Sequence, residues 1–131
     1  MTRYMLDTNM VSHLIKGHPA VALRAASVPI TSLCISAVTE GELHFGLAKR
    51  PDATRLHGAI KELLRCVDVF PWDSAVAQTY GLVLANMYRR GKALGSLDML
   101  IAAHAVCTES ILVTNDSAFR HAPDLSIEDW A

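Results

Sequence analysis

A chain of 131 residues with 51% apolar side chains can build one hydrophobic core but not two ordinary ones, so we expect a single domain over residues 1–131. No stretch approaches the roughly 18 uninterrupted apolar residues of a membrane span, which argues against a membrane protein and predicts a cytoplasmic one. The formal net charge of −1 argues against a uniformly basic nucleic-acid binder.

The cysteines and histidines do not show metal-site spacing. Cys34, Cys66 and Cys107 are odd in number, far apart and set in apolar runs, which predicts buried free thiols rather than disulfides or a zinc site. His104 lies in an apolar helical pattern and is expected in the core. The other five histidines lack the spacing of zinc ligands.

The first predicted element is a short apolar strand, Tyr4-Met5-Leu6, that stops at Asp7-Thr8-Asn9. Helix-like spacing follows at once, so the pattern indicates a buried strand feeding a helix through a tight turn. Asp7 then lies at the carboxyl end of the strand, the edge where open α/β sheets bind ligands. The alternative is that these polar residues only cap the helix.

Further strands are predicted at residues 33–36, 67–70, 111–114 and 125–127. Helices are predicted to end at Gly17, to run from Pro19 toward Pro29, and to span 37–50, 52–64, 73–90 and 97–107, with a helical turn around Phe119. Ser36 and Ser96 are predicted caps, and Asp52 and Asp73 predicted helix starts. This alternation predicts a three-layer α/β/α fold with a central parallel sheet of four to five strands.

Four carboxylates can converge on one edge of such a sheet. Asp7 and Asp116 end strands, while Glu42 and Asp98 lie in helices next to strands. Two unit charges about 4 Å apart repel by roughly 4 kcal/mol at an effective dielectric of 20, so the cluster needs a cation or raised pKa values. Mg²⁺ and Mn²⁺ prefer such oxygen ligands. Outside the cluster, 12 basic side chains face nine acidic ones, a mildly basic surface.

Each acid also has an ordinary structural interpretation. Asp98 would be stabilised by a helix dipole in any first turn, Glu42 fits a solvated helix face, and Asp116 fits a turn or a cap. The four together favour a site.

Four segments resemble, in order, the signature segments of PIN-domain ribonucleases, and most closely those of VapC-type toxins from type II toxin–antitoxin pairs. They are Met5–Asn9 (MLDTN), Ile35–Leu43 (ISAVTEGEL), Leu97–Ala105 (LDMLIAAHA) and Val113–Asp116 (VTND). The resemblance extends to the terminal Glu128-Asp129-Trp130. It implies that Asp7, Glu42, Asp98 and Asp116 bind metal, and that Thr8, Asn9 and Thr114 orient them.

The same resemblance implies an Mg²⁺- or Mn²⁺-dependent endoribonuclease toxin that hydrolyses RNA phosphodiester bonds with no side-chain nucleophile. Similar toxins cut initiator tRNA, which makes tRNA a candidate substrate. A cognate antitoxin is the implied partner, and a homodimer is expected from the apolar content and helix faces. Arg89, Arg90 and Lys92 are the basic cluster predicted to contact RNA phosphates, unless they only complement a helix dipole.

Other functions remain as alternatives. Phosphatases with an aspartate nucleophile need a second aspartate two positions after the first, where this chain has Asn9. A catalytically dead PIN fold would bind RNA or protein only, and the intact acids argue against it. A dinucleotide-binding domain would need a glycine-rich turn after the first strand, which this sequence lacks.

Overall fold

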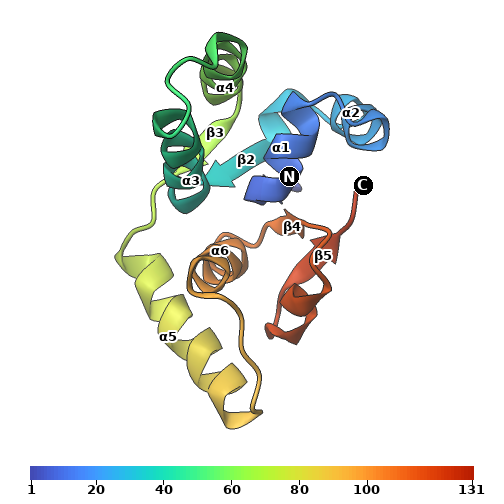
Figure 1. The fold of residues 1–131 in the computed structure, drawn as a ribbon. Coiled ribbons are helices and arrows are strands. Elements are labelled where there is room, and N and C mark those ends of the chain that lie inside the picture. Colours follow the sequence, from blue (N-terminus) through green and yellow to red (C-terminus); the bar gives the residue numbers. More distant parts are fainter.

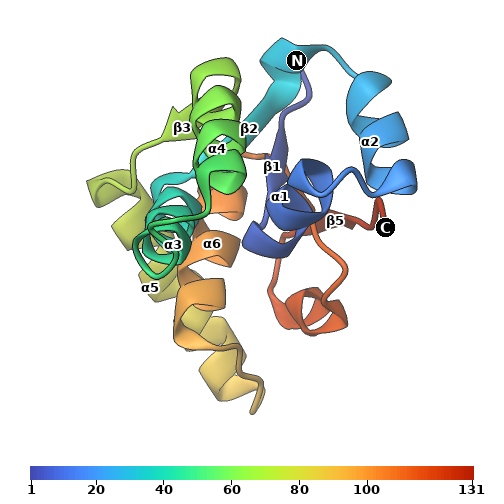
Figure 2. The ribbon, with the colours of Figure 1, turned by 45° about the horizontal axis from the view of Figure 1, so that its top comes forward.

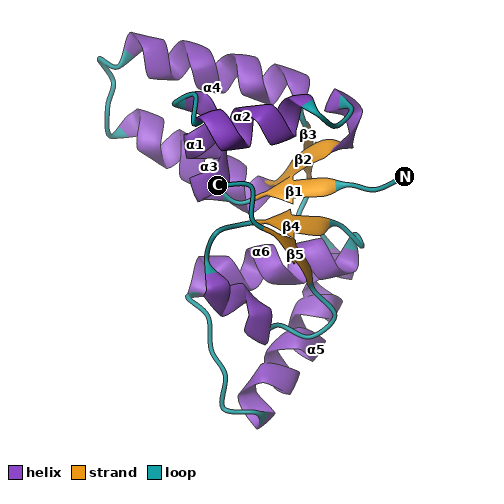
Figure 3. Cartoon of the chain, turned by 90° about the vertical axis from the view of Figure 1, so that its right-hand side faces the viewer, coloured by secondary structure: helices purple, strands orange, loops and turns teal.

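The computed structural model describes residues 1–131. Its centre is a five-stranded, fully parallel sheet with the strand order β3-β2-β1-β4-β5, which confirms the predicted fold class. Figure 3 shows the strands side by side between two groups of helices. The strands are β1 (Tyr4–Leu6), β2 (Leu33–Ser36), β3 (Asp68–Phe70), β4 (Ile111–Val113) and β5 (Ser126–Glu128).

Six α-helices and two 3₁₀ turns connect the strands (Figure 1). They are α1 (Thr8–Ile15), α2 (Pro19–Ala26), η1 (Ile30–Ser32), α3 (Ala37–Ala48), α4 (Thr54–Cys66), α5 (Ser74–Arg89), α6 (Ser96–Cys107) and η2 (Ser117–His121).

Two hydrophobic layers cover the two faces of the sheet, because neighbouring residues of a strand point to opposite sides. Met5 packs with α5, α6 and η2, whereas Leu6 packs with α1, α2 and α4. The other two inner strands, β2 and β4, repeat this alternation through the pairs Cys34 and Ile35, and Leu112 and Val113. The sheet is therefore buried on both faces, as the uninterrupted apolar runs of the strands require.

The strand order creates a switch point at the carboxyl end of β1. From β1 the chain builds outward through β2 to β3, and then α5 and α6 carry it back to place β4 on the other side of β1. Connections leave β1 and β4 in opposite directions, which opens a crevice outside their carboxyl ends. Asp7 follows β1, and Thr114 follows β4.

Most predicted helix limits agree with the structure, and two predicted starts are wrong. Gly17 has φ +75° just after α1, as expected for a helix stop. Asp52 does not open α4, because residues 50–54 form a turn and α4 begins at Thr54 with Ala53 as its cap residue. Ser96 is the first residue of α6 rather than its cap, which is Gly95.

The prediction that all three cysteines are buried is wrong for Cys66. Cys66 is exposed at the end of α4 and Cys107 is half-buried, because each lies near the outer end of its helix. Cys34 is buried within β2, and burial raises the pKa of its thiol to about 11. All three thiols are free, as predicted.

None of the helices combines the length and the hydrophobicity that crossing a membrane requires.

Candidate active site

Asp7 combines a capping role with membership of an acidic cluster. Its side chain is 5% exposed, and Oδ1 accepts a 2.8 Å hydrogen bond from the backbone N–H of Met10 in the first turn of α1. Burial is the main cause that raises the pKa of Asp7, and the charges of Asp116 and Glu42 raise it further. Hydrogen bonds from Thr114 and Met10 oppose this rise. The two interpretations of Asp7 are therefore both supported.

Glu42 reaches the cluster from α3, whose start is fixed at the end of β2. Ser36 caps this helix by accepting a 3.1 Å hydrogen bond from the N–H of Val38. Thr8, the residue after Asp7, donates a 2.6 Å hydrogen bond from its hydroxyl to Oε1 of Glu42. This bond holds the acid of α3 against the first turn of α1.

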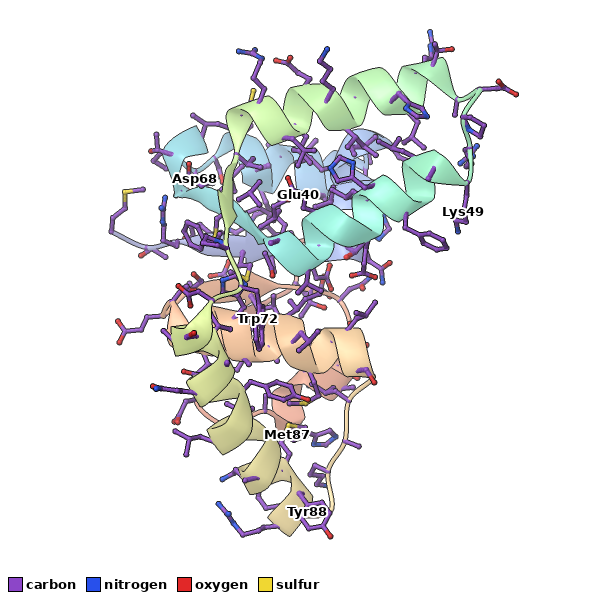
Figure 4. The ribbon with its side chains drawn as sticks, turned by 90° about the vertical axis from the view of Figure 1, so that its left-hand side faces the viewer. Glu40, Lys49, Asp68, Trp72, Met87 and Tyr88 are labelled. Atoms are coloured by element: carbon purple, nitrogen blue, oxygen red, sulfur yellow. The ribbon has the colours of Figure 1, made fainter.

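Asp98 lies half-buried in the first turn of α6. Burial raises its pKa, and the charges of Asp116, Glu42 and Asp7 raise it as well, in that order. The indole N–H of Trp72 donates a 3.0 Å hydrogen bond to the carbonyl of Leu100 and so ties the β3–α5 connection to α6. Figure 4 shows Trp72 at the junction between the β3–α5 connection and α6.

Asp116 faces the cluster from the loop after β4. Its backbone N–H donates a 3.1 Å hydrogen bond to the Thr114 hydroxyl, and its Oδ1 accepts a 3.0 Å bond from the N–H of Ala118. Asp116 is thus the cap of η2, and its charge still acts on Asp7 and Asp98. The structure brings together all four of the acids that the sequence indicated.

Of the three residues predicted to orient the acids, two contact them and the third does not. Thr8 contacts Glu42, and Thr114 contacts both Asp7 and the backbone of Asp116. Asn9 is exposed in α1 and makes no side-chain hydrogen bond, so the structure does not join it to the acids.

Sequence reasoning missed one polar pair that supports the site. His104 is 1% exposed in α6, in the core as predicted, and its Nδ1 lies 2.7 Å from the Ser36 hydroxyl. Ser36 caps α3, so the pair ties the helix of Asp98 to the helix of Glu42. Burial lowers the pKa of His104, which favours the neutral ring. The only signal in the sequence was a histidine inside an apolar helix.

A divalent cation fits the chemistry of these donors. All four are carboxylates. Burial, and after it the charges of the other acids, raise the pKa values of Asp7 and Asp98, and a bound cation would offset both costs of ionisation. No three His, Cys, Asp or Glu side chains are arranged as a ready cage for a metal ion. Mg²⁺ does not need one, because it keeps several waters and uses one or two protein carboxylates together with substrate phosphates.

We predict that Asp7→Asn stabilises the protein without metal. Asparagine caps a helix as well as aspartate does, so the substitution removes only the charge. Because the pKa of Asp7 in the folded protein lies above 3.8, its ionised form destabilises the fold at neutral pH, and this cost disappears as the pH falls toward 3.8. Thermal melts in EDTA at pH 7 should show a gain of about 1 kcal/mol.

The matched control is Asp73→Asn, because Asp73 caps α5 through a 3.2 Å bond to Val76 and lies outside the cluster. Millimolar Mg²⁺ should stabilise wild type and Asp73→Asn by mass action, and Asp7→Asn much less. An Asp7→Asn protein that is less stable in EDTA, with the same response to Mg²⁺ as wild type, would contradict the clustered-acid interpretation.

Comparison with known proteins agrees with this geometry. The family model described as PIN domain matches residues 4–125. The chain belongs to the PIN-domain family. A tRNA(fMet)-specific endonuclease VapC from Shigella flexneri is 34% identical over 132 residues and covers 100% of both chains.

Two solved structures share the fold of this PIN domain over its length. DNA-bound VapBC from Salmonella typhimurium gives a TM-score of 0.90 at 32% identity, covering 100% of both chains. VapBC2 from Rickettsia felis, bound to a DNA fragment from its promoter, gives a TM-score of 0.91 at 26% identity, covering 99% of this chain and 100% of the other.

Proposed function

We propose that this PIN-domain protein is a metal-dependent endoribonuclease toxin that hydrolyses RNA phosphodiester bonds. The observation that carries the proposal is the cluster of Asp7, Glu42, Asp98 and Asp116 at the switch point of the sheet. The pKa values of Asp7 and Asp98 are raised by burial first and then by the charges of the other acids. The ribonuclease names of VapC relatives support the reaction, and tRNA is the first candidate substrate because the Shigella relative is a tRNA(fMet)-specific endonuclease.

The four acids would hold hydrated Mg²⁺ or Mn²⁺. When bound, such a cation neutralises phosphate charge and lowers the pKa of a coordinated water. The chain's own contribution is to present ionised oxygens in fixed positions. Thr8 orients Glu42, Thr114 orients Asp7, and the helix starts of α1 and α6 hold Asp7 and Asp98. The hydroxyls hydrogen-bonded within the cluster are committed, because that of Thr8 donates to Glu42 and that of Thr114 accepts from the backbone of Asp116, so water is the proposed attacking group.

We also propose an antitoxin partner that docks beside the acids. A recess of about 230 Å³ between α1, α3 and α4 is lined by the apolar side chains Ile15, Leu43, Leu56 and Ile60, and by Glu42 at one end. An apolar segment carrying one basic side chain fits this lining. Relatives of known structure were solved as VapBC pairs, and one is described as a member of the VapBC family of toxin-antitoxin systems.

A homodimer is the proposed state of the protein itself. Large apolar side chains remain uncovered on α3 and α5, where Phe45 is 63%, Leu82 75% and Tyr88 83% exposed. Figure 4 shows Tyr88 pointing outward at the end of α5. A second subunit would cover such surface. Sedimentation at high micromolar concentration tests this proposal, and a monomer there would contradict it.

The test of function is sequencing of RNA ends after a brief pulse of expression in cells. Wild type should create new ends at defined sites, and Asp98→Ala should create none of them. Co-expression of the product of the neighbouring gene should suppress the cleavage if that product is the antitoxin. Identical RNA ends from wild type and Asp98→Ala would refute the proposed function.

A further inference from the structure

A second polar recess adjoins the acids on the side opposite the apolar one. It has a volume of about 130 Å³ and lies at the carboxyl ends of β4 and β5. In Figure 2 the helical turn η2, drawn in red-orange, lies beside β5 at this end of the sheet. The recess is lined by Thr114, Asn115, Asp116, Ser117, Arg120, Ile127 and Asp129.

Arg120 is the one basic side chain in this lining, and its guanidinium has no bonding partner in the protein. It is exposed and makes no hydrogen bond or ion pair, although Asp129 lines the same recess. Four other arginines are engaged: Arg3 with Asp68, Arg24 with Glu128, Arg65 with Glu62, and Arg90 with Asn86 and the carbonyl of His121. Among the free arginines, Arg120 alone shares a recess with one of the four acids.

The turn that carries Arg120 is fixed on three sides. Asp116 caps its start, Phe119 is 1% exposed in the core, and the Arg90 guanidinium donates to the carbonyl of His121 at its end. Arg120 therefore projects from a rigid support next to the site. The prediction that Arg90 contacts RNA phosphates is not supported, because its guanidinium is already bound to the protein.

We infer that this recess binds a ribonucleotide next to the scissile bond, with the Arg120 guanidinium on its phosphate. This inference rests on the proposed ribonuclease function. An acidic cluster alone repels a polyanion, and a free guanidinium beside it offsets that repulsion. Guanidinium binds phosphate through two parallel hydrogen bonds, and the unbonded side chains of Asn115 and Ser117 offer donors and acceptors to the same nucleotide.

The experiment compares Arg120→Gln with Arg55→Gln, a substitution that removes the same charge from an exposed arginine of α4 whose recess none of the four acids lines. Binding is measured by fluorescence anisotropy with a labelled single-stranded RNA of mixed sequence, in an Asp98→Ala background that keeps the RNA uncut. Arg120→Gln should weaken binding about tenfold, the size of one charge-assisted contact. It should also reduce the slope of log K against log salt by about 0.7.

Two further measurements complete the test. In the cleaving protein, the loss caused by Arg120→Gln should fall mainly on KM rather than on kcat. Arg120→Lys keeps the charge but not the paired geometry, so it should retain the salt slope and recover only part of the affinity. Equal affinity and equal salt slope in Arg120→Gln and Arg55→Gln would overturn the inference. A wild type that binds RNA through Arg120 but never cuts it would instead refute the proposed function alone.

Discussion

Asp98→Ala should reduce RNA cleavage by orders of magnitude while the protein stays folded. Asp98 is half-buried among three other negative charges and makes no hydrogen bond that the fold needs. In the proposed mechanism its loss removes an oxygen that would hold the cation, and EDTA should abolish wild-type cleavage in the same way. Asp7→Ala and Glu42→Ala should have effects of similar size. Because the acids act as a unit, double variants should be little worse than single ones.

The matched control for this prediction is Glu40→Ala. Glu40 occupies the first turn of α3, as Asp98 occupies that of α6, but it contributes nothing to the raised pKa values of the cluster. Cleavage rates of the purified variants, measured with Mg²⁺ or Mn²⁺, test this prediction. Full activity of Asp98→Ala, or of wild type in EDTA, would contradict the proposed mechanism.

Thr8→Val should weaken the affinity for the divalent cation by about 10- to 100-fold, the range observed when a group that orients a metal ligand is removed. Valine keeps the shape of threonine and removes the hydroxyl that donates a 2.6 Å bond to Glu42. Thr8→Ser restores the hydroxyl and should restore most of the affinity. The Mg²⁺ concentration for half-maximal cleavage and titration calorimetry with Mn²⁺ both measure the effect.

Thr54→Val is the control for Thr8→Val. Thr54 is also the first residue of a helix, but its side chain is exposed and bonds to no acid. If valine at a helix start lowers the stability of the protein, Thr54→Val should show that loss of stability without a change in metal affinity. Equal metal affinities for Thr8→Val and wild type would show that Glu42 needs no orienting hydroxyl.

The sheet and the four acids could be predicted because their signals are local. An apolar run that stops at a polar residue marks the end of a buried strand, and the ends of parallel strands meet at one edge. That reasoning placed Asp7 and Asp116 correctly, and helix starts after Ser36 and near Ser96 brought Glu42 and Asp98 to the same edge.

The contacts that could not be predicted join distant residues. The hydrogen bond between Ser36 and His104 spans 68 positions, and the one from Arg90 to the carbonyl of His121 spans 31. No spacing rule relates such residues, so His104 was predicted only as a packed side chain and Arg90 as a free cation. The predicted helix start at Asp52 was wrong for a different reason. A polar residue in a turn and a polar residue that caps a helix show the same local sequence pattern.

The place of β1 at the centre of the sheet also governs when the site can form. Strand β1 is made first, yet one of its two ladders is with β4, near the other end of the chain. Ribosomes add about 5–20 residues per second, so β1 waits roughly 5–20 seconds for that partner. Until then its β4 edge is unpaired, and Asp7 has no neighbour at 114 or 116. A nascent or truncated chain that ends before β4 therefore lacks Asp116 and carries at most three of the four acids, so the growing polypeptide cannot assemble the complete site until β4 and the loop after it have been translated.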